Sequence, residues 1–477
     1  MLRILVTGLL LMTFVADAVG QPAPDLVDAR AQELFQALNA GEDGDYREFI
    51  RTRVSERLQE RYGEEELAGV LRDLAHALGP TEGQRPIREI TVADEGGFYV
   101  GVRNAQGEPA RLLLMLTDDT ELRFDGFGLL PPELPPAPEV ALSEIAPAIE
   151  EFVGARVEAG QFSGAVLVAR DGEILFGRAY GLADRETGRL NTLDTPINLG
   201  SMNKMFTGLA IAQLEAAGKL NWQDTVGKHL PDFPNATVRD QARIDQLLTH
   251  SSGVPSYWNA AYEARKNEID SLQGFLDTFV DDPLLFQPGQ GNEYSNGGPV
   301  ILGLIIERIT GQSYFDYVRE HIYAPAGMRN SGHFQKTETR SGKAEGYHRS
   351  SPGAELAPNT GWLGLQGSSA GGGYASANDL MRFAEALSAE KLLAREDLEV
   401  LWQVRRHMGP DFGYGYLWGT GTLEGQRWVG HNGGAPGISA DFRYYSESGL
   451  VVIVLANQSR AAMPVSHWVN GLVTQGI

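Results

Sequence analysis

Apolar and polar positions divide the N-terminal third of the chain into helix-type and strand-type stretches. Between residues 26 and 78 apolar side chains recur with helical spacing, and those from Leu26 to Leu38 share one side of a helix. From Ile87 to Phe127 shorter apolar segments follow, broken by the turn candidates Glu95-Gly96-Gly97 and Gln106-Gly107, and this pattern is typical of strands. Helices followed by a strand meander predict a small α+β domain.

A proline-rich segment, LLPPELPPAPE at residues 129–139, predicts a stiff linker that ends this first domain. The domain, residues 25–128, resembles the ketosteroid-isomerase-like cone fold in the order of its elements and in the stretch FQALNAGEDGDYREFI. It contains no convincing pair of acid and base side chains. We therefore expect an accessory or binding domain.

The remaining residues, 140–477, carry strand patterns at both ends. SGAVLVARDGEILFGRAYG predicts a hairpin that turns at Asp171-Gly172, and GISADFRYYSESGLVVIVLAN predicts two strands around Ser446 to Gly449. A helical pattern, LSEIAPAIEEFVGARVEAG, precedes the first hairpin, and about 200 residues of helix and loop pattern separate the two ends. The simplest architecture is one antiparallel sheet built from both ends, flanked by helices, with an all-α insert and a cleft where sheet and insert meet.

Composition limits the classes of partner. Hydrophobic residues make up 42% of the chain and charged residues 21%, as in an ordinary soluble globular protein. A net charge of −22 argues against nucleic acid or anionic lipid as a partner. The chain has no cysteine and no His-Glu-x-x-His motif, so we expect neither disulfides nor a metal ion nor another cofactor.

The first residues, MLRILVTGLLLMTFVADAVGQPAP, have the features of a secretory signal peptide, residues 1–20. An early arginine precedes an apolar run from Ile4 to Val15, and Ala16-Asp17-Ala18 is a small-x-small cleavage site. The run is short for a membrane span, although an uncleaved anchor is the alternative. We expect an exported protein, periplasmic or secreted, without a stable membrane span after cleavage.

The stretch LGSMNKMFTG contains the first candidate for chemistry. Apolar residues from Met202 onward have helical spacing up to a stop at Gly218, which predicts that Ser201 is the N-cap of a helix. Lys204 then lies near the positive end of the helix dipole, where a cation is unfavourable. Burial and the dipole would both favour the neutral amine, which can act as a general base toward the Ser201 hydroxyl one turn away.

Two further segments could complete such a site. Tyr294-Ser295-Asn296 lies in a loop before an apolar helix, where a phenol can relay protons and an amide can orient a lysine and a substrate carbonyl. His431 ends a strand-like segment and is followed by Asn432-Gly433-Gly434, whose glycines can bring backbone N–H groups close to a ligand. Each segment alone also fits a purely structural role.

Three other matches compete with these residues. Ser388 and Lys391 repeat the Ser-x-x-Lys spacing, but their context is that of a surface turn after a helix. Tyr257-Trp258-Asn259 repeats the Tyr-x-Asn spacing in an earlier loop. GSSAG at residues 367–371 fits the Gly-x-Ser-x-Gly nucleophile elbow with Ser369 as nucleophile, although a poor strand precedes it and the next helix starts only near Ser376.

Taken together, residues 140–477 resemble the serine β-lactamase and penicillin-binding-protein superfamily in its class C β-lactamase-like branch. The family's three motifs occur in order as Ser201-x-x-Lys204, Tyr294-x-Asn296 and His431-x-Gly433. Flanking text also matches, including GKLNWQDTVGKHLPDFP, QLLTHSSGVP, YVREHIYAPAGM and SSAGGGYASANDLMRFAEAL. The resemblance implies a β-lactamase/transpeptidase-like α+β fold.

The resemblance also implies roles for the motif residues. Ser201 would attack an ester or amide carbonyl, and Lys204 would take its proton, with Tyr294 as the alternative base and as proton donor to the leaving group. Asn296 would orient Lys204 and the substrate. The N–H groups of Ser201 and Gly434 would bind the oxyanion.

The chain departs from the β-lactamase pattern at His431, where those enzymes have lysine. A neutral imidazole attracts a substrate carboxylate less than an ammonium does. Family members with histidine here include esterases and D-amino-acid peptidases, so the resemblance implies that His431, with Gly433 beside it in the substrate-binding site, favours such an enzyme acting on a small molecule or peptide. The alternatives are a β-lactamase or D-Ala-D-Ala carboxypeptidase, and, in a different class, a non-catalytic protein that binds cell-wall peptides. The sequence leaves the oligomeric state open.

Overall fold

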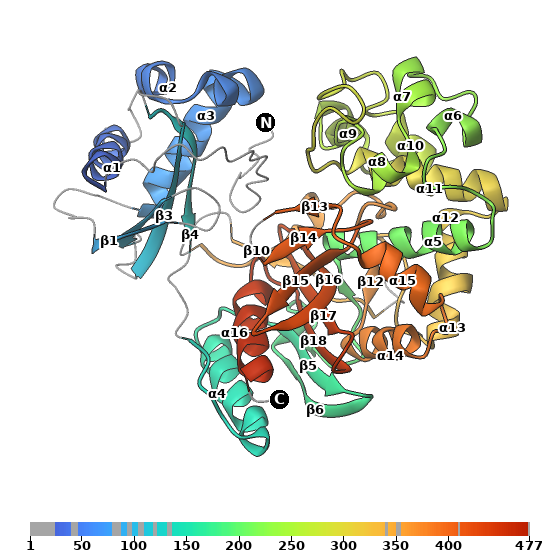
Figure 1. The fold of residues 1–477 in the computed structure, drawn as a ribbon. Helices are drawn as coiled ribbons and strands as arrows, with labels where there is room; N and C mark the ends of the chain where they lie inside the picture. The colour runs from blue at the N-terminus through green and yellow to red at the C-terminus, as the bar shows by residue number, and fades with distance from the viewer. Residues whose placement is uncertain are drawn as a thin grey trace. The chain divides into compact units, whose positions relative to one another are not determined.

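The computed structural model describes most of the chain, and its helices and strands are drawn in Figure 1. The described ranges are 24–39, 46–78, 87–92, 98–103, 109–117, 122–130, 136–338, 342–349, 354–408 and 411–475. These residues form two compact units, and the second begins at Pro136. The proposed signal peptide and the turn candidates at 95–97 and 106–107 lie outside the described residues.

The first unit consists of helices followed by a four-stranded antiparallel meander, as the pattern predicts. Its elements are α1 (Pro24–Leu38), α2 (Arg47–Arg53), α3 (Glu56–Leu78), β1 (Ile87–Val92), β2 (Phe98–Arg103), β3 (Pro109–Leu116) and β4 (Phe124–Leu130). Val27, Ala31, Leu34 and Leu38 of α1 are buried at spacings of three and four residues, in a cluster shared with α3 and the sheet. Strand β4 includes the first two residues of the segment expected to be linker.

An eight-stranded antiparallel sheet is the centre of the second unit. The strand order is β13-β14-β15-β16-β17-β18-β5-β6. The bounds are β5 (Gly164–Arg170), β6 (Glu173–Tyr180), β13 (Arg406–His407), β14 (Phe412–Tyr414), β15 (Gly419–Leu423), β16 (Gln426–Ala435), β17 (Ile438–Tyr445) and β18 (Leu450–Ala456).

Strands from the two ends of the unit pair with each other, as the sequence predicts. In β5 and β18, Gly164 is opposite Ala456 and Arg170 is opposite Leu450, and Figure 1 shows the green strand beside the red one. The hairpin between β5 and β6 turns at Asp171 and Gly172, which have φ of 49° and 83°. Positive φ at both turn residues is the type I′ geometry that Asp-Gly favours.

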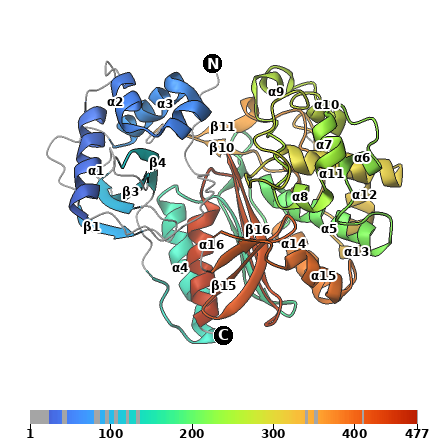
Figure 2. The same cartoon turned by 45° about the horizontal axis from the view of Figure 1, so that its top comes forward.

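Helices cover both faces of this sheet. On one face α4 (Ile145–Glu158) packs with α16 (Ala462–Gln475), as Figure 2 shows. Between these two helices the rings of Phe152 and Trp468 stack 4.1 Å apart. On the other face lie α5 (Lys204–Ala216) and α14 (Ala377–Ser388). Every residue of β18 is buried, as expected for a central strand covered on both sides.

The expected helical insert lies between the β-rich ends. It contains α6 (Val226–His229), α7 (Ala236–Gln241), α8 (Ile244–Leu248), α9 (Ala260–Arg265), α10 (Leu272–Leu276), α11 (Gly297–Thr310), α12 (Tyr314–Val318), the π-helical turn η3 (Arg319–Tyr323) and α13 (Ala324–Ala326). The remaining elements are η1 (Leu142–Glu144), β7 (Leu182–Asp184), β8 (Arg189–Leu190), β9 (Ile197–Asn198), η2 (Gly200–Asn203), β10 (Tyr347–His348), β11 (Ala357–Pro358), η4 (Asn359–Gly361), β12 (Tyr374–Ala375) and α15 (Arg395–Trp402).

The expectation that Ser201 is a helix N-cap is wrong. Ser201 lies inside the 3₁₀ turn η2, and α5 begins only at Lys204. The apolar positions that suggested the helix, from Met202 to Leu214, are buried as predicted, and the chain leaves the helix at Gly218 with φ 67°. The tighter 3₁₀ turn continues into the α-helix, so the apolar spacing alone does not separate the two.

Candidate active site

Lys204 lies beside Ser201 and is completely buried. Its Nζ is 3.2 Å from Ser201 Oγ, 2.7 Å from Asn296 Oδ1 and 2.6 Å from the carbonyl oxygen of Ala370. Thus the spacing in the sequence does place the serine and the lysine in contact.

These three contacts suit a neutral amine. Asn296 Oδ1 and the Ala370 carbonyl can only accept hydrogen bonds, so they use the two N–H donors of a neutral Lys204. In that neutral form the remaining lone pair would face Ser201 Oγ and accept its O–H, whereas a protonated amine would donate to all three oxygens. Burial also lowers the pKa of Lys204 well below its usual value, because the charged form loses its hydration.

Tyr294 and Asn296 come from the loop that precedes α11, as expected. The Asn296 amide is oriented by a second contact, since its Nδ2 donates to Ser256 Oγ at 3.2 Å. Lys204 Nζ is 4.7 Å from the centre of the Tyr294 ring. Burial raises the pKa of Tyr294, and a hydrogen bond with the Ser201 hydroxyl opposes part of that rise. A neutral phenol and a neutral amine are therefore both favoured.

The third motif lies within a strand and not after one, which corrects the expectation for His431. Strand β16 continues from Gln426 to Ala435. At Gly433 a Cβ atom would be 1.8 Å from the carbonyl oxygen of Leu199, just before the turn that carries Ser201. Gly433 therefore allows strand and turn to approach each other, a different use from the expected approach to a ligand. The Gly434 nitrogen lies 3.0 Å from the Cβ position of Gly200, next to the same turn.

His431 is buried and both of its ring nitrogens have partners in the protein. Nδ1 is 2.5 Å from the carbonyl oxygen of Asn432, and Nε2 is 2.9 Å from the Tyr414 hydroxyl. Burial, with a smaller effect of Lys204, lowers the pKa of His431 to about 4. The lowered pKa favours a neutral imidazole, and both ring nitrogens are already occupied by partners within the protein.

The competing serines have structural contacts. Ser369 is fully buried, and its hydroxyl donates to the Pro299 carbonyl at 2.8 Å. No strand leads into it, and α14 starts only at Ala377, so it lacks the strand-turn-helix setting of a nucleophile elbow. Ser388, the last residue of α14, and Lys391, which follows the helix, are both exposed.

The competing Tyr-x-Asn tripeptide is also structural. Tyr257 packs its ring on Tyr262 and Phe275, at centroid distances of 5.1 and 4.9 Å. Asn259 caps α9 by accepting from the Tyr262 N–H at 2.9 Å.

Three groups at the site were not identified from the sequence: the Ala370 carbonyl, Tyr414 and His250. The first has no sequence signal, because any residue has a carbonyl. His250 lies in the QLLTHSSGVP stretch, which matches the family, but the sequence does not predict its contact with Tyr414 at 3.4 Å.

Within the described ranges, no cluster of three or more His, Asp or Glu side chains is arranged to hold a metal ion. Among the same residues, no helix has both the length and the apolar character needed to cross a membrane.

Comparison with known proteins gives the family of this second unit. The Beta-lactamase family model matches residues 149–472, a range that includes all three motifs. Penicillin-binding protein 4* of Bacillus subtilis (strain 168) is 32% identical over 320 residues, which cover 63% of this chain and 69% of that protein. Esterase EstB of Burkholderia gladioli is 34% identical over 293 residues, covering 53% of this chain and 73% of that protein.

The fold agrees with a solved structure as well. The crystal structure of a penicillin binding protein from Bacillus halodurans matches with a TM-score of 0.61 and 30% identity, covering 67% of this chain and 98% of that one. The expected β-lactamase-like fold, an antiparallel sheet flanked by helices, is thereby confirmed. The comparisons concern the second unit, and the likeness of the first unit to a ketosteroid-isomerase-like domain stays a prediction. The chain belongs to the beta-lactamase family of serine hydrolases.

Proposed function

We propose that this protein hydrolyses ester or amide bonds through an acyl-enzyme formed on Ser201, with neutral Lys204 as the general base. The observation that carries the proposal is that Lys204 is completely buried with its amine nitrogen 3.2 Å from Ser201 Oγ. In the neutral form the amine would donate to Asn296 Oδ1 and to the Ala370 carbonyl, and its lone pair would accept from the Ser201 hydroxyl.

In the acylation step, Ser201 Oγ forms a bond to the substrate carbonyl carbon while its proton moves to Lys204 Nζ. The carbonyl π electrons move to oxygen, and the N–H groups of Ser201 and Gly434 stabilise that oxyanion. The oxyanion then collapses and the bond to the leaving group breaks. Tyr294 passes the proton from Lys204 to the departing oxygen or nitrogen, since its phenol bonds Ser201 and its ring lies against the amine.

In the deacylation step, a water molecule attacks the acyl carbon and gives its proton to the same amine. Collapse of the second tetrahedral intermediate returns the proton to Ser201 Oγ and releases the carboxylic acid. Tyr294 as the base is the alternative. It is less favoured because it needs a phenolate, and burial raises the pKa of that phenol.

For the substrate, we propose a neutral ester or a D-amino-acid amide or peptide, in preference to a β-lactam or a peptide ending in D-Ala-D-Ala. His431 supports this choice, because it is uncharged and both ring nitrogens are occupied. The relatives include a protein called an esterase and others called penicillin-binding proteins, so either substrate class has a counterpart among them.

The remaining parts of the proposal concern the rest of the chain. We propose export to the periplasm or the exterior through residues 1–20, and domain bounds of 25–128 and 140–477. We propose that the first domain, with its ketosteroid-isomerase-like order of elements, is an accessory or binding domain and takes no part in catalysis.

The test uses the purified protein with a fluorophosphonate probe and three substrates: a short-chain p-nitrophenyl ester, a chromogenic cephalosporin and a peptide ending in D-Ala-D-Ala. We expect one adduct, mapped to Ser201 by peptide mass spectrometry, and fastest turnover of the ester. Ser201→Ala should lose the adduct and the turnover while its melting temperature stays close to that of the wild type. Ser388→Ala, in the exposed second Ser-x-x-Lys, is the matched control and should keep both.

The same experiment separates an enzyme from a non-catalytic binding protein. A binding protein would form no adduct and would turn over none of the three substrates. An adduct on Ser369, or activity retained by Ser201→Ala, would overturn the assignment of the nucleophile.

A further inference from the structure

Beside the Ser201–Lys204 pair, three buried side chains from three different segments form one continuous row of hydrogen bonds. The backbone N–H of Ser295 is 3.2 Å from His250 Nδ1, and His250 Nε2 is 3.4 Å from the Tyr414 hydroxyl. That hydroxyl is 2.9 Å from His431 Nε2. The row therefore begins in the loop of Tyr294 and Asn296 and ends in strand β16.

The two ends of the row fix the direction of every hydrogen bond. The Ser295 N–H can only donate, so His250 Nδ1 accepts and His250 Nε2 carries the hydrogen that is donated to Tyr414. At the other end the Asn432 carbonyl can only accept, so His431 Nδ1 carries a hydrogen and His431 Nε2 accepts from the Tyr414 O–H. Each imidazole is thereby held as one neutral tautomer, and each is donor and acceptor once.

Because the row is buried, each of its polar atoms needs a hydrogen-bond partner within the protein. The side chains of His250, Tyr414 and His431 belong to residues that are 4%, 7% and 8% exposed, so water cannot easily replace a missing partner. Burial is also the main reason that both imidazole pKa values are lowered, in agreement with neutral rings.

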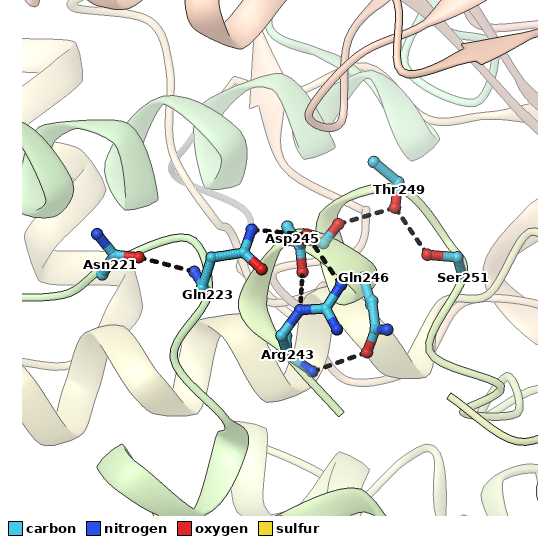
Figure 3. A network of polar contacts seen from close by, with 7 residues as sticks. All are labelled: Asn221, Gln223, Arg243, Asp245, Gln246, Thr249 and Ser251. Carbon is cyan, nitrogen blue, oxygen red and sulfur yellow. Dashed lines mark hydrogen bonds and ion pairs between the residues drawn. The ribbon is translucent and has the colours of Figure 1, made fainter. Parts of the chain in front are cut away.

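The position of His250 is itself strongly fixed. Its φ of 57° is unusual for a residue other than glycine. Figure 3 shows the polar contacts around its two neighbours: Thr249 Oγ1 donates to the Asp245 carbonyl at 2.8 Å and lies 2.9 Å from Ser251 Oγ. On the other side of the turn, the Glu293 N–H donates to the His250 carbonyl at 3.0 Å, which joins the turn to the loop of Tyr294.

We propose that Tyr414 is a positioning residue that, through His250 and His431, holds the Tyr294–Asn296 loop at a fixed distance from strand β16. Asn296 bonds Lys204 and Tyr294 bonds Ser201, while Gly434 of β16 lies close to Gly200, the residue before Ser201. Loss of the hydroxyl would let Tyr294 and Asn296 move relative to Gly434, the proposed oxyanion donor. This inference rests on the proposed function, and it gives His431 a role other than binding a substrate carboxylate.

The kinetic test is Tyr414→Phe, which removes only the central hydroxyl and leaves two imidazole nitrogens without their partner. With the best ester found, we expect kcat to fall about tenfold or more while KM changes less than about threefold, because misplacement affects the transition state more than substrate binding. Tyr416→Phe is the matched control: it removes a hydroxyl two residues away, on a ring that packs against Trp222 outside this row, and kcat should stay within about twofold.

A double-mutant cycle that combines Tyr414→Phe with His431→Gln shows whether the two residues affect kcat together or independently. If the row acts as one unit, Tyr414→Phe combined with His431→Gln should lower kcat little more than the larger single change. Additive losses, or an unchanged kcat in Tyr414→Phe, would overturn the proposal.

A readout that does not depend on activity is the nitrogen NMR signature of histidine-labelled protein, assigned with His250→Gln and His431→Gln. We expect the Nε2–H tautomer at His250 and the Nδ1–H tautomer at His431 at pH 7. The opposite tautomer or a protonated ring at either residue would overturn the row. Failure of the proposed function is distinguishable, because it would appear as no fluorophosphonate adduct on Ser201 in the wild-type protein while these tautomers were present.

Discussion

The amine nitrogen of Lys204 lies 2.6 Å from the carbonyl oxygen of Ala370, which is 166 residues later in the chain. That carbonyl is held in place by a tight turn, in which the N–H of Ser368 donates to the Gly371 carbonyl at 2.8 Å and the N–H of Ala370 bonds Ser368 Oγ at 3.1 Å. A fixed carbonyl at this position receives one hydrogen of the amine, so that in the neutral form the lone pair of the amine is available to Ser201.

The first prediction concerns the chemistry of this amine. Lys204→Arg keeps a long basic side chain but cannot supply a neutral base, since guanidinium is not deprotonated in proteins. We expect turnover of the best substrate to fall roughly 100-fold or more, the usual contribution of a general base. Steady-state kinetics, with a melting curve to show that the larger side chain is accommodated, measure this effect.

The control for that prediction is Lys391→Arg, at the exposed lysine of the second Ser-x-x-Lys, which should be close to wild type. Near wild-type turnover in a folded Lys204→Arg protein would contradict a neutral-lysine base. Tyr294 would then become the leading base.

The second prediction concerns stability and pH. Because the pKa of Lys204 is lowered in the folded protein, the unfolded chain binds one more proton between that lowered value and about 10.5. The free energy of unfolding therefore rises with pH in this window, by up to about 1.4 kcal/mol per pH unit for one proton. Lys204→Met has no titrating group at position 204. The free energy of unfolding of the wild-type protein should therefore rise, relative to that of Lys204→Met, as the pH is raised from 7 to 9.

Denaturant unfolding of both proteins at several pH values measures this difference. A difference that stays constant over the whole range would mean that Lys204 is charged in the folded protein. A neutral-amine mechanism would then be untenable.

The sequence was informative where contacts are local or repeat a pattern. Ser201 and Lys204 are three residues apart, and the hairpin at Asp171-Gly172 follows from turn chemistry, so both could be predicted. The pairing of β5 with β18 could also be predicted, because only a sheet built from both ends accounts for two separate sets of apolar strands.

The sequence was less informative where tertiary packing decides the outcome. At Gly433 strand β16 lies directly against Leu199, at the start of the turn that carries Ser201, and no local sequence pattern predicts that contact. The contact that keeps His431 from the substrate could not be predicted, because its partner Tyr414 is 17 residues earlier, on a strand two positions away in the sheet. The backbone carbonyl of Ala370 has no residue identity to read.

The third prediction tests the close approach at Gly433. In Gly433→Ala the new Cβ would be 1.8 Å from the Leu199 carbonyl oxygen, so either the strand or the turn must move. We expect a loss of roughly 2 kcal/mol or more of stability, as for an overpacked core, and a melting temperature about 5 °C lower or more. Labelling of Ser201 by the fluorophosphonate should also slow.

Gly434→Ala is the control for stability alone, because the nearest atom to its Cβ would be 3.9 Å away. Its melting temperature should stay near that of the wild type. If the two alanine variants were equally stable, Gly433 would not be the point that fixes the distance between strand and turn.

The last prediction concerns substrate choice. We expect the wild-type protein to hydrolyse a short-chain ester faster than a cephalosporin. His431→Lys should reduce this difference between the two hydrolysis rates, because it has two opposing effects on activity. An ammonium cannot accept the hydrogen of Tyr414, so ester hydrolysis should fall about as far as in Tyr414→Phe. The same ammonium can pair with a substrate carboxylate, a contact worth about 1.5–3 kcal/mol, which should offset the loss for the cephalosporin.

The measurement is kcat/KM for both substrates in both proteins, at low and high salt, because exposed parts of a carboxylate interaction are screened by ions. Equal losses on the two substrates would mean that residue 431 acts only through Tyr414 and does not reach the carboxylate even as lysine. A wild-type protein that prefers the cephalosporin would contradict the esterase assignment itself, since a neutral and fully hydrogen-bonded His431 gives the carboxylate no cation to bind at this position.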